Sequence, residues 1–516
     1  MSTKKCSKEA KFIDKTNGEK KYRRKKRYPY KLYVPGNINI QELAEQATEI
    51  LRFEKDYMVY VLHIIVAIPS RLKDFDIELH KGYTPICKQI LSRRVHNYKQ
   101  YINYLKKQKV IEEGSSYKPK YYAKGLKYSQ KYRTPVIGVF ITKNTLIKSI
   151  TESVNNRDIQ AEAKLSFLKD WFNPKLTIDM EEVIAFLEYE REQKARELQY
   201  YRDVLQIKNP KVSIEEIVTM GYNMKYIVAD KINGGRHHHP IVDSTSGRFH
   251  SPLTQLKSEL RQYVRYNGER LYALDIVNSQ PLLSLVVIDY NIFRKNDILG
   301  IISNYNDEFQ NDYNAYKPYN QQNPSSTMLV NLLRKCIFQP DVDSFKTSVI
   351  SGTFYEDFGK LLVMKNLIPP DITGETNEAE KTKKVRKFAK QAMFTAFFSK
   401  LSDIRWNKYI QAFKACYPGV YNVFSLIKTQ PKKLNSNLDE PSRHNTLACV
   451  LQRFESNLIL HDICCEINSI NPLIPLFTIH DSIATTREHL DLVKSIMEKH
   501  IMAKLGVNPK LKIEEW

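Results

Sequence analysis

Apolar and polar positions alternate in two different ways along this chain. From Ile38 to about residue 230, the apolar residues mostly recur every three or four positions, which is typical of helices that bury one face. The longest such run covers residues 180–206. From about residue 231, short apolar runs and turn residues alternate with helical stretches. The pattern predicts a mainly helical N-terminal half and a second half of mixed helices and strands.

Residues 84–109 are expected to form one amphipathic helix. The apolar side chains on one face are spaced alternately by four and three, and they are Leu91, Val95, Tyr98, Ile102 and Leu105. The opposite face carries side chains able to contact phosphates and base edges, namely Arg93, Arg94, His96, Asn97, Lys99, Gln100, Asn103 and Lys106. Arg93, Arg94 and Lys99 are therefore candidate nucleic-acid contacts.

A short strand at residues 110–111, a Gly-Ser-Ser turn and a basic, aromatic ribbon over residues 117–133 follow this helix. The order of helix, strand and basic hairpin resembles the winged helix-turn-helix domains of replication initiators and regulators, over about residues 40–135. The alternative is a plain helical domain with a solvated basic face.

Two short stretches far apart in the sequence each form an apolar run that leads to an aspartate. The first leads to Asp275 and the second to Asp481, and each run predicts a buried strand with a carboxylate at its end. Two carboxylates facing each other would be costly to bury unless a divalent cation neutralised them, and hard oxygen ligands suit Mg²⁺. The pattern favours a metal site at Asp275 and Asp481. The alternative is that each aspartate caps the following helix or turn.

A basic helix is predicted over residues 383–399, between the two aspartates. Arg386, Lys390, Phe394 and Phe398 recur every four residues and so share one helix face. Two cations near the helix N-terminus suit a triphosphate, and two aromatic rings beyond them suit a base. This helix is a candidate nucleotide-binding element.

Charge strengthens the case for a nucleic-acid partner. The 516 residues contain 80 Lys and Arg against 57 Asp and Glu, a net charge of +23 that is natural for a protein that neutralises phosphates. The first 36 residues are rich in Lys and Arg and predict a flexible, phosphate-binding arm. A nuclear-localisation signal is the alternative interpretation of the same charges.

Cysteine usage and hydropathy indicate in which cellular compartment the protein is expected. The seven cysteines form no CxxC pair, which argues against a disulfide framework or a zinc ribbon. The histidine triplet at residues 237–239 is interpreted as part of a strand and not as a metal site. Consecutive residues of a strand point to opposite faces, and no acid or cysteine nearby completes a ligand set. The N-terminus is polar and no apolar run reaches about 18 residues, so neither a signal peptide nor a membrane span is expected, and no membrane partner is expected. The expected location is cytoplasmic, in a reducing compartment.

Four motifs stand in the order that they have in the family A, polymerase I-like DNA polymerases. Gly247-Arg248 resembles the Gly-Arg stretch that contacts the primer-template. Asp275 with Asn278, Ser279 and Gln280 resembles the first palm motif, and His480-Asp481 resembles the second. The helix face of Arg386, Lys390, Phe394 and Phe398 resembles the fingers helix of that family. The resemblance covers about residues 231–516.

This resemblance implies an α+β fold of the right-hand polymerase type, in which a palm with an antiparallel sheet carries helical fingers and a helical thumb, preceded by the winged-helix-like domain. The implied regions are a basic arm (1–36), a winged-helix-like DNA-binding domain (37–135), a helical thumb-like region (136–230), the first part of the palm (231–290), the fingers (291–430) and the second part of the palm (431–516).

The resemblance also implies roles for single residues. Asp275 and Asp481 would hold two Mg²⁺ ions, and Arg386 and Lys390 would offset the charge on the phosphates. The residues implied at the nucleotide are Gln280, Phe394, Phe398 and His480. Those implied at the duplex are Arg248, Arg261 and Gln452. The implied partners are a DNA primer-template and dNTPs, with origin duplex DNA as a candidate partner of the N-terminal region.

The expected activity is that of a DNA-directed DNA polymerase acting in the replication of a phage, plasmid or mobile element. Three departures from the family pattern bear on sugar choice: Gln280 stands where Glu is usual, Phe398 where Tyr is usual, and Ser482 where Glu is usual. The last feature is shared with single-subunit phage-type RNA polymerases, which are one alternative. A non-catalytic DNA-binding replication initiator is the other. Asp76 and Glu78 have the spacing of a proofreading pair, but no supporting acids follow, so no proofreading is expected.

Overall fold

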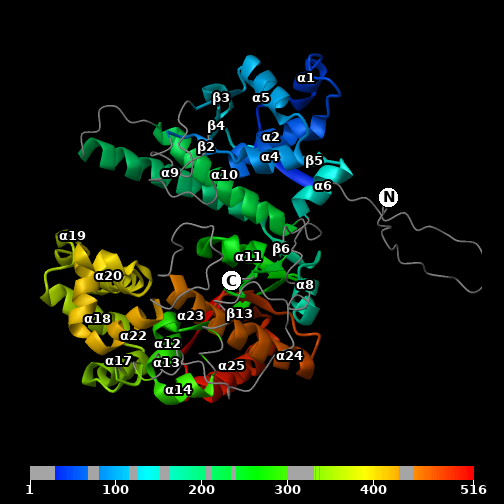
Figure 1. Cartoon of the computed structure of the whole chain (residues 1–516). Coiled ribbons are helices and arrows are strands. Elements are labelled where there is room, and N and C mark those ends of the chain that lie inside the picture. Colours follow the sequence, from blue (N-terminus) through cyan, green and yellow to red (C-terminus); the bar gives the residue numbers. More distant parts are fainter. Residues whose placement is uncertain are drawn as a thin grey trace, which may run out of the picture. The chain divides into compact units, whose positions relative to one another are not determined.

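The structure is a computed structural model, and it falls into two compact units that are described separately (Figure 1). One unit contains Met1–Glu152 and Pro210–Thr219, and the other contains Ser153–Asn209 and Met220–Trp516. The residues described are 30–67, 81–114, 125–151, 163–204, 212–233, 240–243, 245–296, 298, 301, 331, 333–335, 337–428 and 445–516. Outside this set lie several segments discussed above: the basic arm up to residue 29, Asp76, Glu78, part of the basic ribbon, and the histidine triplet at 237–239.

The first unit combines short helices with two small sheets. Its helices are α1 (Ile40–Glu45), α2 (Lys55–Ala67), α4 (Lys88–Arg94), α5 (Tyr98–Lys107) and α6 (Asn144–Thr151). One sheet pairs β1 (Tyr30–Pro35) antiparallel to β5 (Val136–Ile141). The other has the order β2-β4-β3, made by β2 (Thr84–Pro85), β3 (Ile111–Glu113) and β4 (Gly125–Tyr128). The helix α2 is buried over most of its length and forms the centre of this unit.

Two boundaries of this unit differ from those expected. Residues 30–35 form a strand and are not part of a flexible arm, and residues 136–141 pair with that strand instead of starting a thumb-like region. Residues 210–219 also belong here, because Glu216 is buried and accepts a hydrogen bond of 2.7 Å from Arg133. The pairing of β1 with β5 joins segments about a hundred residues apart, so no local signal in the sequence predicts it.

The prediction of one helix over residues 84–109 is wrong. Thr84 and Pro85 pair with β4, and the helical stretch is broken between α4 and α5, where Asn97 adopts a left-handed conformation with φ 55°. Asn tolerates this conformation better than most residues, which explains why the chain turns there. The predicted apolar face is retained across the break, because Leu91, Val95, Ile102 and Leu105 are all buried.

The second unit is mixed α+β and largely helical. Its main sheet has the order β12-β13-β11-β14 and is antiparallel throughout, with β11 (Tyr272–Ile276), β12 (Phe477–Ile479), β13 (Ser482–Thr485) and β14 (Leu511–Glu515). Smaller sheets are formed by β6 (Leu176–Ile178), β9 (Val264–Tyr266) and β10 (Glu269–Arg270), and by β7 (Ile241–Val242) and β8 (Phe249–His250).

The helices of the second unit gather in two groups in Figure 1. The yellow and yellow-green group contains α17 (Pro340–Ser351), α18 (Phe354–Met364), α19 (Pro370–Thr373), α20 (Glu378–Phe398) and α22 (Pro418–Lys428), and α21 (Lys408–Cys416) packs on α20. The second group lies beside the main sheet and contains α23 (Thr446–Ser456), a π-helix (Asn457–Cys464), α24 (Cys465–Ile470) and α25 (Leu490–Leu505).

Further helices of this unit precede or connect these groups. They are α8 (Ser166–Asp170), α9 (Met180–Val204), α10 (Ile214–Asn233, in this unit from Met220), α11 (Pro252–Gln255), α12 (Ser279–Leu283), α13 (Leu285–Ile288) and α14 (Tyr290–Lys295), with short 3₁₀ helices at Ser258–Tyr263, Leu401–Arg405 and Arg487–His489. None of the helices in the described ranges is both long enough and apolar enough to cross a bilayer.

The helix α20 shows why this group packs as it does. Asn377 caps its N-terminus by accepting from the backbone N–H groups of Ala379 and Glu380, which satisfies two otherwise unpaired donors. Its buried stripe ends at Phe397, whose ring packs edge-on against Phe424 with 4.6 Å between centroids. The cap fixes where the helix begins, and the aromatic contact fixes which face turns to the core.

Candidate active site

Sheet pairing brings the two aspartates together. Asp275 is the penultimate residue of β11, and its antiparallel partner on β13 is Ser482. Asp481 directly precedes Ser482 in the tight turn between β12 and β13, where His480 takes a positive φ of 54°. The sequence pattern predicted each aspartate after its strand. Asp481 does follow β12, in the hairpin turn, whereas Asp275 lies within β11. Both carboxylates nevertheless lie at one end of the main sheet.

This end of the sheet carries a concentration of negative charge. Burial raises the pKa of Asp275 to about 7, and the charges of Asp481 and Glu514 add to that effect. Glu514 on β14 pairs with Ala273, which lies two residues before Asp275 and so on the same face of β11. Holding these carboxylates together in the absence of a cation costs folding free energy.

Three cations face the acidic group. Lys390 from α20 and Lys512 from β14 both act to lower the pKa of Asp275, against the larger effect of burial. Lys512 is the register partner of Asp275 and donates to Glu514 at 2.8 Å. Burial lowers the pKa of Arg261, and Glu514 and the two aspartates oppose that shift. The site therefore combines carboxylates with basic side chains from three separate elements.

The donor set is suited to Mg²⁺ shared with a substrate. Among the residues described, no group of three or more His, Cys, Asp or Glu side chains is arranged to hold a metal ion by itself. Mg²⁺ is commonly held by one or two carboxylates, with waters and substrate phosphates completing its octahedron. Asp275 and Asp481 fit that pattern, and they do not fit a site closed entirely by protein ligands.

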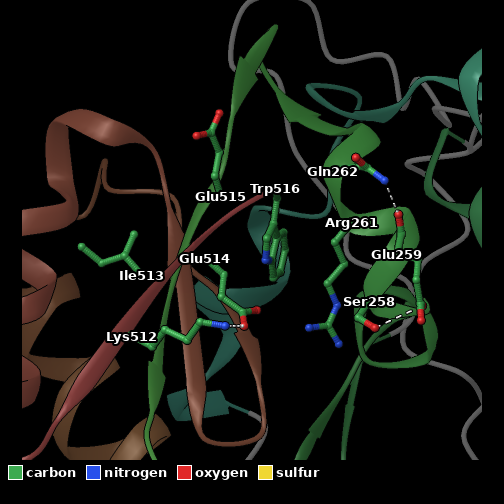
Figure 2. Close-up of a pocket in the computed structure, with 9 residues that line it drawn as sticks. All are labelled: Ser258, Glu259, Arg261, Gln262, Lys512, Ile513, Glu514, Glu515 and Trp516. Carbon is green, nitrogen blue, oxygen red and sulfur yellow. Dashed lines mark hydrogen bonds and ion pairs between the residues drawn. The ribbon is translucent and has the colours of Figure 1, made fainter. Parts of the chain in front are cut away.

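Arg261 lines a cleft of about 310 Å³ beside the main sheet (Figure 2). Its guanidinium lies over the indole of the buried Trp516, 5.5 Å from the ring centroid. The lining residues are Ser258, Glu259, Arg261, Gln262, Lys512, Ile513, Glu514, Glu515 and Trp516. The structure thus places Arg261 in a polar cleft that shares Lys512 and Glu514 with the surroundings of the aspartates.

Arg386 on α20 is engaged by two other segments. Its Nε donates to Glu356 at 2.6 Å, and one terminal nitrogen donates to Asn278 at 3.0 Å. The Asn278 side chain also donates to the carbonyl of Gly352 at 2.8 Å. Arg386 lies over the ring of Tyr355 as well, 5.3 Å from its centroid. The segment after β11 and the helices α18 and α20 are connected through this arginine.

The other members of the predicted helix face lie further along α20. Lys390 is exposed and lies over the ring of Phe394, with its Nζ 5.9 Å from the centroid. Phe394 and Phe398 are half-buried, with 5.7 Å between their ring centroids. The cations and rings therefore follow one another along the helix as the spacing predicted.

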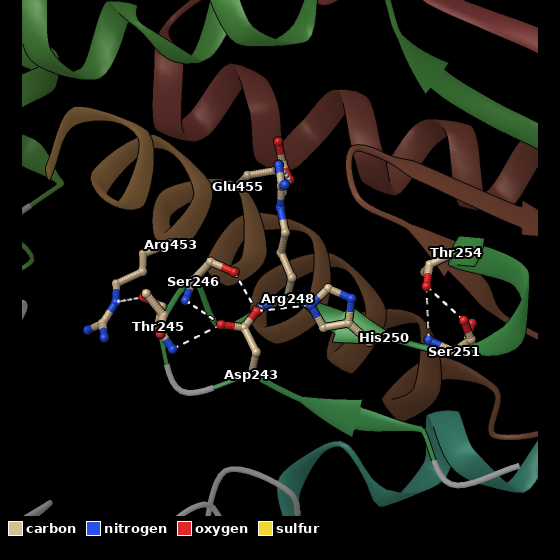
Figure 3. Close-up of polar contacts among 9 residues, drawn as sticks. All are labelled: Asp243, Thr245, Ser246, Arg248, His250, Ser251, Thr254, Arg453 and Glu455. Carbon is tan, nitrogen blue, oxygen red and sulfur yellow. Dashed lines mark hydrogen bonds and ion pairs between the residues drawn. The ribbon is translucent and has the colours of Figure 1, made fainter. Parts of the chain in front are cut away.

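A turn presents Arg248 to the interior of the second unit (Figure 3). The carboxylate of Asp243 accepts from the backbone N–H groups of Thr245, Ser246 and Arg248. Burial alone would raise the pKa of Asp243, but hydrogen bonds from His250 and Ser246 outweigh it and hold the pKa well below the usual range. An ionised Asp243 therefore organises the Gly247-Arg248 turn.

Arg248 and Gln280 converge on one buried carboxylate. Arg248 donates through Nε and a terminal nitrogen to Oε1 of Glu455, at 2.9 and 2.7 Å. Gln280 donates through its amide nitrogen to Oε2 of Glu455 at 2.8 Å. Gln452, on the same helix α23, is half-buried. The sequence indicated Arg248, Gln280 and Gln452 as site residues but assigned no role to Glu455.

His480 is held in its neutral form. Burial lowers the pKa of His480 to about 4, and the nearby Arg248 adds to that shift. Its ring lies edge-on to that of His250, with 6.4 Å between centroids, and its Nδ1 is buried without a hydrogen-bond partner among the described residues. The turn that carries Asp481 is thus lined by a neutral imidazole.

Sequence reasoning missed Glu455, Glu514 and Tyr355. Tyr355 is buried near Arg386 and Asp481, and its pKa is raised chiefly by burial. Glu455 had a usable signal, because it lies four residues after Leu451 and three before Leu458, on an otherwise apolar helix face. Tyr355 and Glu514 gave no signal, since their proximity to the aspartates depends on tertiary packing.

The three candidate nucleic-acid contacts in the first unit are of two kinds. Arg93 and Lys99 are exposed. Arg94 is half-buried, and it donates to the hydroxyl of Tyr60 at 2.5 Å and lies over that ring. Of these three side chains, Arg93 and Lys99 are therefore the ones that a phosphate could reach directly.

Comparison with known proteins gives one kind of match. No protein-family model matches the sequence, and no curated protein matches it. Among solved structures, the chain is similar to the POL domain of Pol1 from M. smegmatis in complex with DNA primer-template and dNTP. The TM-score is 0.40 with 10% sequence identity, and the match covers 69% of each chain. A similarity at this level does not assign a family or an activity to this chain.

Proposed function

We propose that this chain is a template-directed nucleotidyltransferase, namely a family A-like, DNA-dependent DNA polymerase that extends a primer without proofreading. The observation that carries the proposal is the pairing of β11 with β13, which places Asp275 beside the turn of Asp481. Lys390 of α20 faces the same carboxylates. Paired carboxylates opposed by basic side chains suit transfer of a phosphoryl group, in which charge on the phosphates must be offset.

Each residue of the site then has a task. Asp275 and Asp481 would hold two Mg²⁺ ions, which when bound supply Lewis-acid stabilisation of the attacking and leaving oxygens. Lys390 and Arg386 would bind the phosphates of the incoming nucleotide, and Phe394 and Phe398 would pack against its base and the templating pair. Arg248, Arg261 and Gln452 would contact the duplex product. His480, neutral near pH 7, would line the nucleotide site without adding charge.

The proposed regions follow the units of the structure. The main sheet with α23 and α25 would be the palm, the group α17 to α22 would be the fingers, and α9 with the later part of α10 would be the thumb. The first unit would bind duplex DNA, including an origin, through Arg93 and Lys99. A basic surface of this kind binds phosphates regardless of sequence and weakens as salt rises.

A single-subunit RNA polymerase is the second candidate, and Ser482 is the observation that favours it. Ser482 is buried opposite Asp275, where a carboxylate is usual in the DNA polymerases that the chain resembles. Gln280 argues for deoxyribonucleotides, because its volume is close to that of the Glu it replaces and would block the space of a 2′-hydroxyl. We give Gln280 more weight, since Ser482 lies at the metal site and not under the sugar.

The test is extension of a labelled primer by the purified full-length protein. Primed and unprimed templates are incubated with Mg²⁺ and either dNTPs or rNTPs, and products are separated on a denaturing gel. The expected result is extension of the primed template with dNTPs. Extension with rNTPs alone, or RNA made without a primer, would favour the RNA polymerase.

The Asp481→Asn variant separates an enzyme from a non-catalytic initiator, which would tolerate the change. Asp491→Asn is the matched control, because Asp491 is exposed in the first turn of α25. Extension by the control and not by Asp481→Asn supports the polymerase. Absence of extension by the wild type under every condition contradicts it.

A further inference from the structure

Glu455 is the most deeply buried carboxylate at the candidate site. Its side chain is 1% exposed, and it lies on α23 where Figure 3 shows Arg248 reaching it from the Asp243 turn. Both of its oxygens are used, one by the guanidinium of Arg248 and the other by the amide of Gln280. Burying a carboxylate is unfavourable unless its acceptors are satisfied, and here three N–H donors satisfy them.

The contact fixes which way the Gln280 amide is turned. Only the NH₂ group of an amide can donate to a carboxylate, so Glu455 selects one of the two amide orientations. Because Gln280 is buried as well, an amide that lost this acceptor would be left with an unsatisfied donor. A neutral amide in place of Glu455 would offer one acceptor and one donor, so either Arg248 loses its acceptor or the Gln280 amide must turn over and accept instead of donate.

Two charged groups, each on a separate turn, act on Glu455. Arg248 comes from the Asp243 turn, and Asp481 comes from the turn between β12 and β13. His480, on that same turn, is near Arg248 and is neutral. Burial, followed by the charge of Asp481, raises the pKa of Glu455 to about 7, against the effect of Arg248 and of the Gln280 hydrogen bond.

We propose that Glu455 is a positioning residue for sugar selection. By accepting a hydrogen bond from Gln280, it holds that side chain in the position that excludes a ribonucleotide, and the same carboxylate also holds Arg248. This inference rests on the proposed polymerase function. It adds that the bulk of Gln280 is insufficient by itself, because an unanchored side chain can rotate away from an added 2′-hydroxyl. It also predicts that the positions of Arg248, proposed to contact the duplex, and Gln280, proposed to select the sugar, both depend on the carboxylate of Glu455.

The test compares single-nucleotide insertion of dATP and ATP by the full-length protein. Glu455→Gln removes the carboxylate that accepts from the Gln280 amide and leaves Gln280 itself unchanged. Gln280→Met keeps a side chain of similar length but removes the donor, and it leaves the ion pair of Glu455 with Arg248 intact. Each variant is expected to lose about threefold to tenfold of the wild-type preference for dATP, as expected for removal of one buried hydrogen bond.

A double-mutant cycle distinguishes positioning from a general structural effect. In a Gln280→Ala background, Glu455→Gln should change the ratio of dATP to ATP insertion no further, because the side chain that it positions is gone. Glu466→Gln is the matched control, since Glu466 pairs with Lys499 and His500 on the surface of the same unit. That variant should keep the wild-type ratio.

The outcomes separate this inference from the proposed function. A wild type that extends no primer overturns the proposed function. A wild type that extends with dNTPs, while Glu455→Gln and Gln280→Met both keep its discrimination, overturns only the role of Glu455. If Glu455→Gln fails to fold, as judged by its thermal transition, Gln280→Met alone decides, because it leaves the buried ion pair in place.

Discussion

Arg386 of α20 donates a hydrogen bond of 2.6 Å to Glu356 of α18, so the arginine proposed to meet the phosphates is paired with an acid in this structure. Both side chains are partly exposed, and such pairs contribute little to stability. A triphosphate would therefore compete with Glu356 for the guanidinium, while Asn278 continues to orient it.

Glu356→Gln is accordingly expected to strengthen nucleotide binding. The KM for the incoming nucleotide should fall by about twofold to fivefold with kcat nearly unchanged, because removing one exposed ion pair frees the arginine at a small energetic cost. Steady-state primer extension measures both constants. Glu378→Gln, on an exposed glutamate in the first turn of α20, is the control. A higher KM for Glu356→Gln would show that this acid orients Arg386 and does not compete for it.

Asp481→Asn is expected to reduce primer extension by at least about 10²–10³-fold, as for removal of a central electrostatic interaction with the transition state. Affinity for primer-template should stay within about threefold, because it depends mainly on basic residues elsewhere. Gel extension and fluorescence anisotropy measure the two properties on the same preparation. Extension at a rate near wild type would contradict the assignment of the metal site.

Asp275→Asn should make the metal-free protein more stable. The folded-state pKa of about 7 lies above the usual value of 3.8, so the folded state binds the proton more tightly than the unfolded state. The resulting destabilisation of the wild type grows as pH rises from about 4 and is complete above pH 7. The variant should melt about 1–3 °C higher at pH 8 in EDTA, and this gain should shrink at pH 5.

Mg²⁺ and a second aspartate provide the controls for that measurement. Added Mg²⁺ should raise the melting temperature of the wild type more than that of Asp275→Asn. Burial opposes ionisation of Asp289, but the backbone N–H of Ile292 and the Lys346 ammonium outweigh it and hold its pKa below the usual range. Asp289→Asn should therefore lower the melting temperature. Equal shifts for both variants would show that repulsion at Asp275 is not the cause.

The parts of the site that sequence could predict are those with a local pattern. Asp275 and Asp481 each follow an apolar run, and the helix around Arg386 and Phe394 shows its period directly. The pattern favoured a shared metal site for the two aspartates, but it could not give the strand register, because β11 and β13 are about 200 residues apart and pair by tertiary packing.

Other features depend on contacts that leave no periodic trace. Glu455 and Arg248 are 207 positions apart, and no spacing rule relates them. The break at Asn97 was missed because the apolar period continues across it, so the pattern is that of one helix although the backbone turns. The pairing of β1 with β5 was missed for a related reason, since short strands from opposite ends of a unit contain no mutual signal.

Gln280→Ala tests exclusion of the 2′-hydroxyl by bulk. Cutting the side chain back opens the space that it fills, so incorporation of ATP relative to dATP should rise by at least about tenfold, or roughly 1.4 kcal/mol of discrimination. Single-nucleotide insertion measures the ratio. If the wild type prefers ATP, or if the alanine variant discriminates as well as the wild type, Gln280 is not the selecting residue and the RNA polymerase becomes the better proposal.

The exposed cations of the first unit should set salt-dependent binding to duplex DNA. Arg93 and Lys99 are exposed, whereas Arg94 is engaged with Tyr60. Removing one cation that neutralises a phosphate reduces the slope of log affinity against log salt by about 0.9. The double variant Arg93→Gln with Lys99→Gln should therefore lower that slope by about 1.8 if both residues bind phosphates, whereas Arg94→Gln should change it less.

Two controls make this prediction specific. Lys55→Gln removes an exposed lysine at the start of α2 and should leave the slope unchanged if binding is confined to the α4 and α5 surface. Primer extension at low salt should be the same for all of these variants, because the proposed catalytic residues belong to the second unit. A uniform decrease in slope for Arg93, Lys99 and Lys55 would instead indicate a diffuse attraction from net charge, since a defined contact surface depends on position and a diffuse field does not.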